Sequence, residues 1–115
     1  MKTRIRTAAM TAGICLIWGA SAAHAENWVR VVDNPGGNVT YVDVDVDSIR
    51  KDPDGIVYFR EQDDWDSETI GINCQTRERY TVDYWKARGE DWRAHPLETG
   101  GINVDVADFV CARAT

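Results

Sequence analysis

The sequence contains few of the residues from which catalytic and metal sites are usually built. Its 115 residues include two histidines and three cysteines, and no C-x-x-C pair occurs. His95 is the only histidine after residue 25, and neither Ser48 nor Ser67 lies in the G-x-S-x-G context of a nucleophile elbow. This scarcity argues against a zinc site, a thiol redox centre and a Ser-His-Asp triad. We therefore predict that the protein is not an enzyme and holds no metal or cofactor.

Positive charge is also scarce. Lys and Arg number 13 against 19 Asp and Glu, and three of the basic residues lie before residue 7. The remaining chain carries 10 basic and 19 acidic residues, a net charge of about −9. Such a surface repels nucleic acid and anionic membranes, so neither is an expected partner. It suits a basic partner, although it is also typical of a domain that is simply soluble.

The first 25 residues predict a cleavable export signal. Basic residues precede an apolar run over residues 8–18, and an A-x-A cleavage pattern ends at Ala25. The run is shorter than the roughly 20 residues of a membrane span, which disfavours an uncleaved anchor. Ile14 before Cys15 does not fit a lipoprotein signal, so no lipid anchor is predicted. We expect residues 26–115 to form one domain without a membrane span, in the periplasm or at the cell surface of a Gram-negative-type bacterium.

Two cysteines remain after the predicted cleavage, Cys74 and Cys111. In an oxidising compartment they are expected to pair. The loop that they would close is roughly 38 residues long, for which chain-entropy arithmetic gives about 4 kcal/mol of stabilisation. A metal or redox site would instead require closer spacing or several nearby histidines.

The mature region is predicted to form short strands separated by turns. Turn sequences occupy residues 34–37 and 52–55, and Asp47 and Ser48 can cap a short helical turn through Arg50. The expected strands cover residues 28–32, 39–44, 56–61, 70–74, 80–85 and a short stretch from Trp92 to Pro96.

The apolar period changes from two to 3.6 residues after Gly101, which predicts a C-terminal helix with Asn103 as its N-cap. Its apolar stripe consists of Ile102, Val106, Phe109 and Val110. Cys111 lies beside this stripe, and Cys74 lies on the apolar face of its strand. We therefore predict an α+β fold, an antiparallel sheet of about five to six strands with the C-terminal helix packed on one face and tied by one disulfide.

Four short motifs stand out along the predicted domain. They are Tyr41-Val42-Asp43, Asp47-Ser48-Ile49-Arg50, the lone strand cysteine in Asn73-Cys74-Gln75-Thr76-Arg77-Glu78-Arg79-Tyr80, and Trp92 and Pro96 before a helix that ends in Val110-Cys111. With these motifs the chain resembles the bacterial surface-adhesin E family over residues 28–113. The resemblance implies a surface or periplasmic protein with a disulfide-tethered helix on a small sheet. Some members of that family are adhesins that bind host matrix and plasma proteins.

The chain departs from the family pattern at three points. It has no lipobox, it carries an extra Val-Asp unit within residues 41–47, and Gly-Gly-Ile-Asn at residues 100–103 replaces the usual Pro-Gly-Ser at the start of the helix. The missing lipobox leaves an alternative open. The protein would then be a soluble periplasmic module, such as an inhibitor of an exported enzyme or an envelope-stress factor.

A calcium loop is one alternative for the alternating acids Asp43, Asp45 and Asp47. The spacing resembles the start of an EF-hand, but Ser48 and Asp54 stand where that loop requires glycine and glutamate. Alternation with valine also predicts a strand with one wet face. The strand interpretation is favoured, and calcium binding stays open.

Candidate partner-binding residues gather around one tryptophan. Asp63, Asp64, Asp66 and Glu68 surround Trp65, and an acidic loop with an exposed aromatic ring could bind a basic partner. The alternative is a solvated hairpin loop in which the ring folds back on the sheet. Glycoside hydrolysis by paired acids requires a cleft, for which the sequence provides no sign.

Trp85 is the second aromatic candidate. In the predicted strand it shares a face with Thr81 and Asp83, which would leave it exposed for binding. Packing against Trp28 or Trp92 is the alternative. We expect the partner to be a protein and the chain to be a monomer or an edge-paired homodimer.

Overall fold

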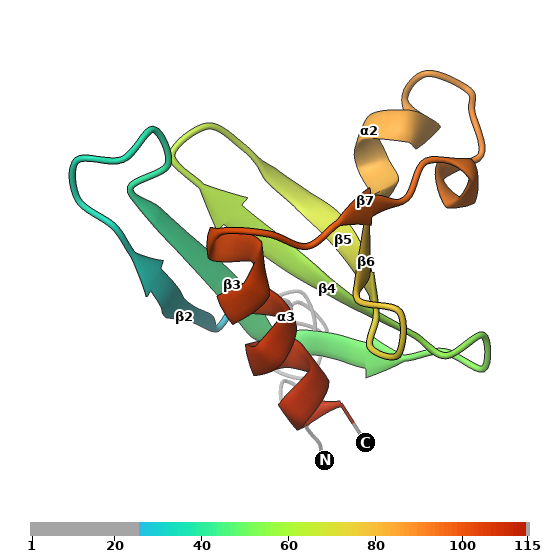
Figure 1. Ribbon diagram of the computed structural model, residues 1–115, viewed down its shortest axis with the longest axis horizontal. Coiled ribbons are helices and arrows are strands. Elements are labelled where there is room, and N and C mark those ends of the chain that lie inside the picture. The colour runs from blue at the N-terminus through green and yellow to red at the C-terminus, as the bar shows by residue number, and fades with distance from the viewer. Residues whose placement is uncertain (1–25, 115) are drawn as a thin grey trace, which may run out of the picture.

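The computed structural model describes residues 26–114, and the predicted export signal over residues 1–25 lies outside the described residues. These residues form one antiparallel sheet in which each strand lies beside the preceding one, in the order β2-β3-β4-β5-β6-β7 (Figure 1). The strands are β2 (Trp28–Asp33), β3 (Tyr41–Lys51), β4 (Ile56–Asp63), β5 (Ser67–Asn73), β6 (Glu78–Thr81) and β7 (Leu97–Glu98). The helices are α2 (Val82–Lys86), a 3₁₀ helix (Trp92–Ala94) and α3 (Ile102–Arg113).

The C-terminal helix α3 covers one face of the sheet, as the sequence predicts. It crosses β2, β3 and β4 (Figure 1), and its own residues Val106, Ala107 and Val110 are fully buried against the sheet. Their neighbours in this core are Val32, Val42, Val44, Val57, Phe59, Ile70 and Ile72. The Cys74–Cys111 disulfide joins the end of β5 to α3, with the two Cα atoms 5.9 Å apart. The predicted α+β fold with one tethering disulfide is therefore confirmed.

A second, smaller core lies on the opposite face of the sheet. Along β4, Tyr58 alternates with the residues that face α3, so its ring points to the other side. Trp92 of the 3₁₀ helix packs edge-on against Tyr58 and Tyr80, with ring centroids 5.7 and 5.3 Å apart. Ile56 and Val82 complete this cluster. Burial raises the pKa of Tyr58 to about 12, and its hydroxyl donates a hydrogen bond to Asp54 at 2.8 Å.

The predicted helical turn at residues 47–50 is wrong, because β3 continues through it to Lys51. The pairing of β3 with β4 shifts register between Asp45 and Arg50, which marks a bulge. At this bulge the Ser48 hydroxyl donates to the Asp45 carbonyl at 2.6 Å and accepts from the Arg60 amide at 2.7 Å. A side chain that suits a helix cap here satisfies backbone groups of the sheet instead.

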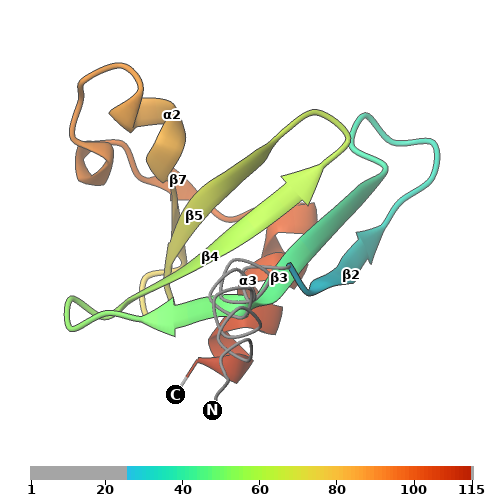
Figure 2. The ribbon, with the colours of Figure 1, turned by 180° about the vertical axis from the view of Figure 1, so that it is seen from behind.

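The predicted strand over residues 80–85 is also wrong beyond Thr81. The chain turns there into α2, which lies beside the start of β5 (Figure 2). Asp83 in the first turn accepts a hydrogen bond from the Thr69 amide at 2.9 Å and pairs with Arg60 at 3.0 Å. These contacts fix α2 against β5. Tyr84 consequently points outward and is 47% exposed, instead of sharing a buried row with Tyr80.

The last predicted strand is displaced along the chain. Residues 92–94 form the 3₁₀ helix, capped by Asp91, whose carboxylate accepts from the Arg93 amide at 3.0 Å. The sixth strand is β7, which pairs with β6. The predicted N-cap Asn103 lies inside α3, which begins after Gly101 at a φ of 56°, a backbone region that glycine adopts readily. No helix within residues 26–114 is long and apolar enough to cross a membrane.

Candidate functional site

A cavity of about 510 Å³ opens between the start of β5, helix α2 and the segment that leads into β7. We call it the aromatic pocket. It is lined by Glu68, Thr81, Tyr84, Trp85, Ala94, His95, Pro96 and Leu97. Its volume lies within the range of about 300–1,000 Å³ that is typical of ligand-binding cavities.

Two stacked rings form one wall of the aromatic pocket. The imidazole of His95 lies flat on the indole of Trp85, with centroids 3.5 Å apart and planes inclined by 7°. His95 Nε2 lies 3.0 Å from a carboxylate oxygen of Glu90, which orients the imidazole. Tyr84 meets Trp85 edge-on at 5.0 Å. Three aromatic rings from α2 and the segment before β7 therefore support one another without a ligand.

Large apolar side chains remain exposed at the rim of the pocket. Tyr84 is 47% exposed and Leu97 is 52% exposed. The guanidinium of Arg88 lies over the Tyr84 ring, 3.7 Å from its centroid. Exposed aromatic and aliphatic side chains beside a concave surface are typical of contact sites for other molecules.

Glu68 is the acidic residue in the lining of the pocket, and it is half-buried. Burial raises the pKa of the Glu68 carboxyl, the negative charges of Asp66, Glu61 and Asp83 raise it further, and Arg79 opposes the shift. Among residues 26–114, Glu68 makes no ion pair and its carboxylate accepts no hydrogen bond.

The nearby cation Arg79 is already paired. Its two terminal nitrogens donate to the two carboxylate oxygens of Glu61 at 3.0 and 2.6 Å, and both side chains are at least nine-tenths buried. Glu61 lies directly opposite Glu68 across β4 and β5. The guanidinium is therefore hydrogen-bonded to one of the two facing carboxylates. Its charge also acts on the other, Glu68, which makes no direct ion pair among residues 26–114.

Trp65, the first sequence candidate, lies in the loop between β4 and β5. The residue is 77% exposed, so its ring is not folded back on the sheet. Its indole nitrogen donates a long hydrogen bond of 3.4 Å to the Asn38 carbonyl in the neighbouring loop. The structure thus leaves Trp65 available for contact. Glu68 of the aromatic pocket lies three residues later in the chain, near the start of β5.

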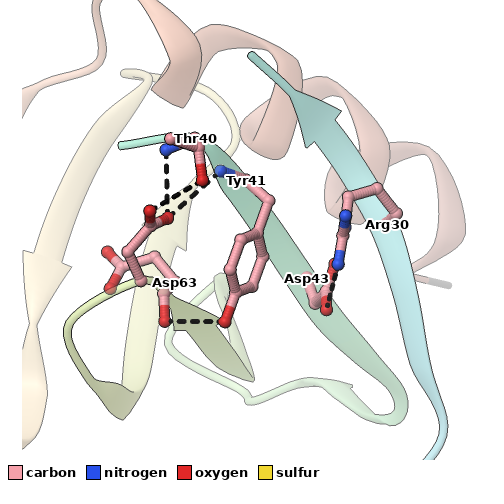
Figure 3. Close-up of polar contacts among 6 residues, drawn as sticks. Arg30, Thr40, Tyr41, Asp43 and Asp63 are labelled. Atoms are coloured by element: carbon pink, nitrogen blue, oxygen red, sulfur yellow. Dashed lines mark hydrogen bonds and ion pairs between the residues drawn. The ribbon is translucent and has the colours of Figure 1, made fainter. Parts of the chain in front are cut away.

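The three acids around Trp65 hold the loop together. Asp64 accepts from the Thr40 amide at 3.0 Å, the Thr40 hydroxyl at 2.7 Å and the Tyr41 amide at 3.2 Å. The bond from the Thr40 hydroxyl contributes most to holding the pKa of Asp64 below its usual value. Asp63 accepts from the amides of Trp65 and Asp66, and its carbonyl accepts from the Tyr41 hydroxyl (Figure 3). Asp66 accepts from the amide of the next residue.

Two of the three alternating acids of β3, Asp43 and Asp45, also have partners within the domain. Asp43 pairs with Arg30 at 2.6 Å (Figure 3), and Asp45 accepts from the amides of Asn27 and Asp47 at 3.1 and 3.2 Å. Within the part of the chain that the structure describes, no three His, Cys, Asp or Glu side chains are grouped to hold a metal ion.

The structure separates the sequence candidates into two places. Asp63, Asp64, Trp65 and Asp66 share one loop, whereas Trp85 belongs to the aromatic pocket. Tyr84, His95 and Leu97 are not among the site residues that the sequence predicts. The stacking of His95 on Trp85 depends on the helix α2, whereas the sequence predicts a strand at these residues. No local sequence pattern therefore reveals the stack.

Fold and pocket together define a small disulfide-tethered α+β protein with an aromatic cavity lined by a carboxylate that makes no ion pair among residues 26–114. Neither a protein-family model, a curated protein sequence nor a solved structure matches the chain. The resemblance to the surface-adhesin E family therefore stays a prediction.

Proposed function

We propose that the chain is an exported binding protein that contacts a protein partner through the aromatic pocket, as the resemblance to the surface-adhesin E family also suggests. The observation that carries this proposal is the Trp85–His95 stack, which forms one wall of the cavity of about 510 Å³. Preformed walls lower the ordering cost of binding. The residue types at the rim, tyrosine and tryptophan, are those enriched at the energetic centres of protein interfaces.

The proposal places the protein in the periplasm or at the cell surface. The Cys74–Cys111 disulfide is compatible with an oxidising compartment. Protease treatment of intact cells separates the two locations, because an adhesin is digested from outside while a periplasmic module is protected. The absence of a lipobox favours the protected form.

The binding role is tested by removing an apolar side chain from the pocket rim. Envelope proteins captured on the immobilised protein are identified, and the captured protein is titrated by surface plasmon resonance. Leu97→Gln removes a rim contact and is expected to weaken binding at least about tenfold. Val104→Gln is the matched control, since Val104 is an exposed apolar residue of α3.

Three results would contradict the proposal. If Leu97→Gln binds the captured protein as tightly as the wild type, the pocket is not the contact surface. If Trp65→Ala alone abolishes binding, the contact surface is the β4–β5 loop and not the aromatic pocket. Failure to capture any envelope protein would remove the binding role itself.

A further inference from the structure

We propose that the aromatic pocket receives a lysine or arginine side chain of a basic protein partner, with Glu68 as its counter-charge. This inference rests on the proposed function and names the chemistry of the partner. Three features of the pocket support it, namely its charge, its apolar lining and its aromatic rings.

The charge distribution calls for a cation at Glu68. Arg79, the cation whose charge acts on Glu68, is already paired with Glu61 at 2.6 Å. Glu68 is half-buried in an apolar cavity and makes no ion pair within residues 26–114. A partly desolvated carboxylate without a counter-ion is unfavourable, and an incoming ammonium or guanidinium group removes that cost.

The lining fits the stem of a basic side chain. Leu97, Pro96 and Trp85 provide apolar lining in the same cavity as Glu68. Lysine and arginine pack their methylene chains on such surface while the charged head reaches a polar group. An apolar wall with one acid therefore matches a side chain that is apolar along its length and positive at its end.

Arg88 covers one face of the Tyr84 ring and His95 one face of the Trp85 ring, so a cation would be attracted to the opposite face of each. Tyrosine and tryptophan faces attract ammonium and guanidinium groups. The protein already places one guanidinium in this way, because Arg88 lies 3.7 Å from the centroid of the Tyr84 ring at the rim. The imidazole of His95 does not repel the incoming cation, because the Glu90 carboxylate lies 3.0 Å from its Nε2 atom and offsets a positive charge there.

Acidic and neutral ligands fit less well. An acidic side chain would meet Glu68 and the net charge of −6 of the whole chain. A neutral apolar side chain would fill the cavity but would bury Glu68 further without neutralising it. The pocket is therefore expected to discriminate by charge as well as by shape.

The experiment uses four capped tripeptides, acetyl-Gly-X-Gly-amide, in which X is lysine, arginine, norleucine or glutamate. Norleucine keeps an unbranched aliphatic chain and removes the charge. Each peptide is titrated into the purified, ¹⁵N-labelled, disulfide-bonded protein, and the Trp85 indole signal is followed by NMR after assignment with Trp85→Phe. We expect the lysine and arginine peptides to bind at least about fivefold more tightly than the norleucine peptide, and the glutamate peptide to cause no shift.

The role of Glu68 is tested with a matched pair of variants. Glu68→Gln removes one negative charge from the pocket, and Asp105→Asn removes one from the exposed side of α3. The preference for lysine over norleucine should disappear in Glu68→Gln and persist in Asp105→Asn. Amide spectra of both variants that superimpose on the wild-type spectrum outside the substituted sites establish that they are folded.

Each other outcome overturns the inference. Equal affinity for the norleucine and lysine peptides shows a pocket that selects shape alone and leaves the proposed function intact. A lysine preference that survives Glu68→Gln removes Glu68 as the counter-charge. If no peptide shifts the Trp85 signal at millimolar concentration, the pocket does not receive a basic side chain. The proposed function has its own test and fails if Leu97→Gln binds the captured envelope protein as tightly as the wild type does.

Discussion

The buried ion pair between Glu61 and Arg79 is the most consequential polar contact at the scale of single residues. Both side chains are at least nine-tenths buried, and two hydrogen bonds join them. A buried pair of this kind gives little net stability over an apolar pair, but loss of one partner leaves an uncompensated charge. The pair also engages both terminal nitrogens of Arg79 with Glu61, while Glu68 makes no direct ion pair among residues 26–114.

Glu61→Gln is therefore expected to lower the free energy of unfolding by about 3 kcal/mol, because Arg79 would keep its charge and lose its carboxylate. The measurement is urea denaturation followed by tryptophan fluorescence. Asp108→Asn serves as the control, since it breaks the exposed Arg77–Asp108 pair and should cost less than about 1 kcal/mol. Similar losses of unfolding free energy in the two variants would mean that burial does not make the Glu61–Arg79 pair more costly to break than the exposed Arg77–Asp108 pair.

At the scale of secondary-structure elements, the disulfide and the buried stripe of α3 act on the same contact. Val106 and Val110 are fully buried against the sheet, and Cys111 follows them directly. The disulfide closes a sequence separation of 37 residues. Helix α3 belongs to the main core, so its release would expose the apolar face of β2, β3 and β4.

Replacement of Cys74 and Cys111 by serine is expected to lower the free energy of unfolding by up to about 4 kcal/mol, through the greater entropy of the unfolded chain. Urea denaturation of the double variant and of the wild type with and without reductant provides the comparison. The reduced wild type should match the double variant. Identical midpoints for the oxidised wild type and the variant would show that α3 needs no covalent tether.

The elements that the sequence predicts correctly are those whose pattern follows from one buried face. The stripe of α3 and the alternation of Ile70 and Ile72 both reflect a single core. Prediction fails at Ser48 and Asp83, where polar side chains bond to distant backbone amides, those of Arg60 and Thr69. Such contacts are set by tertiary structure and leave no local pattern.

At the scale of the whole molecule, the same limit explains why the sequence singles out Glu68 and Trp85 in separate places and does not join them in one pocket. The pocket forms where α2 and the segment before β7 approach the start of β5, which joins residues far apart in the chain. The β4–β5 loop, by contrast, is a local feature, and its acids and Trp65 can be recognised together from the sequence. A site assembled from several elements can be recognised only when the fold is known.

The two outer strands of the sheet bear on the oligomeric state. Strand β2 forms one edge, and its register with β3 shifts between Arg30 and Val32, which indicates a bulge. The other edge, β7, has two residues. Bulges, charged side chains and very short strands are the features by which natural sheets prevent pairing between copies.

We therefore expect the purified protein to be a monomer at about 100 μM, a concentration at which a paired edge would associate. Light scattering coupled to size-exclusion chromatography measures the mass directly. Replacing Arg30 and Asp33 by valine removes the charges from β2 and should promote association, whereas the same change at Lys86 of α2 should not. A wild-type mass of two chains would contradict this expectation and favour a homodimer. If Pro substituted for Val31 then restored one-chain mass, β2 would be the strand that pairs, because proline removes a backbone donor from that edge.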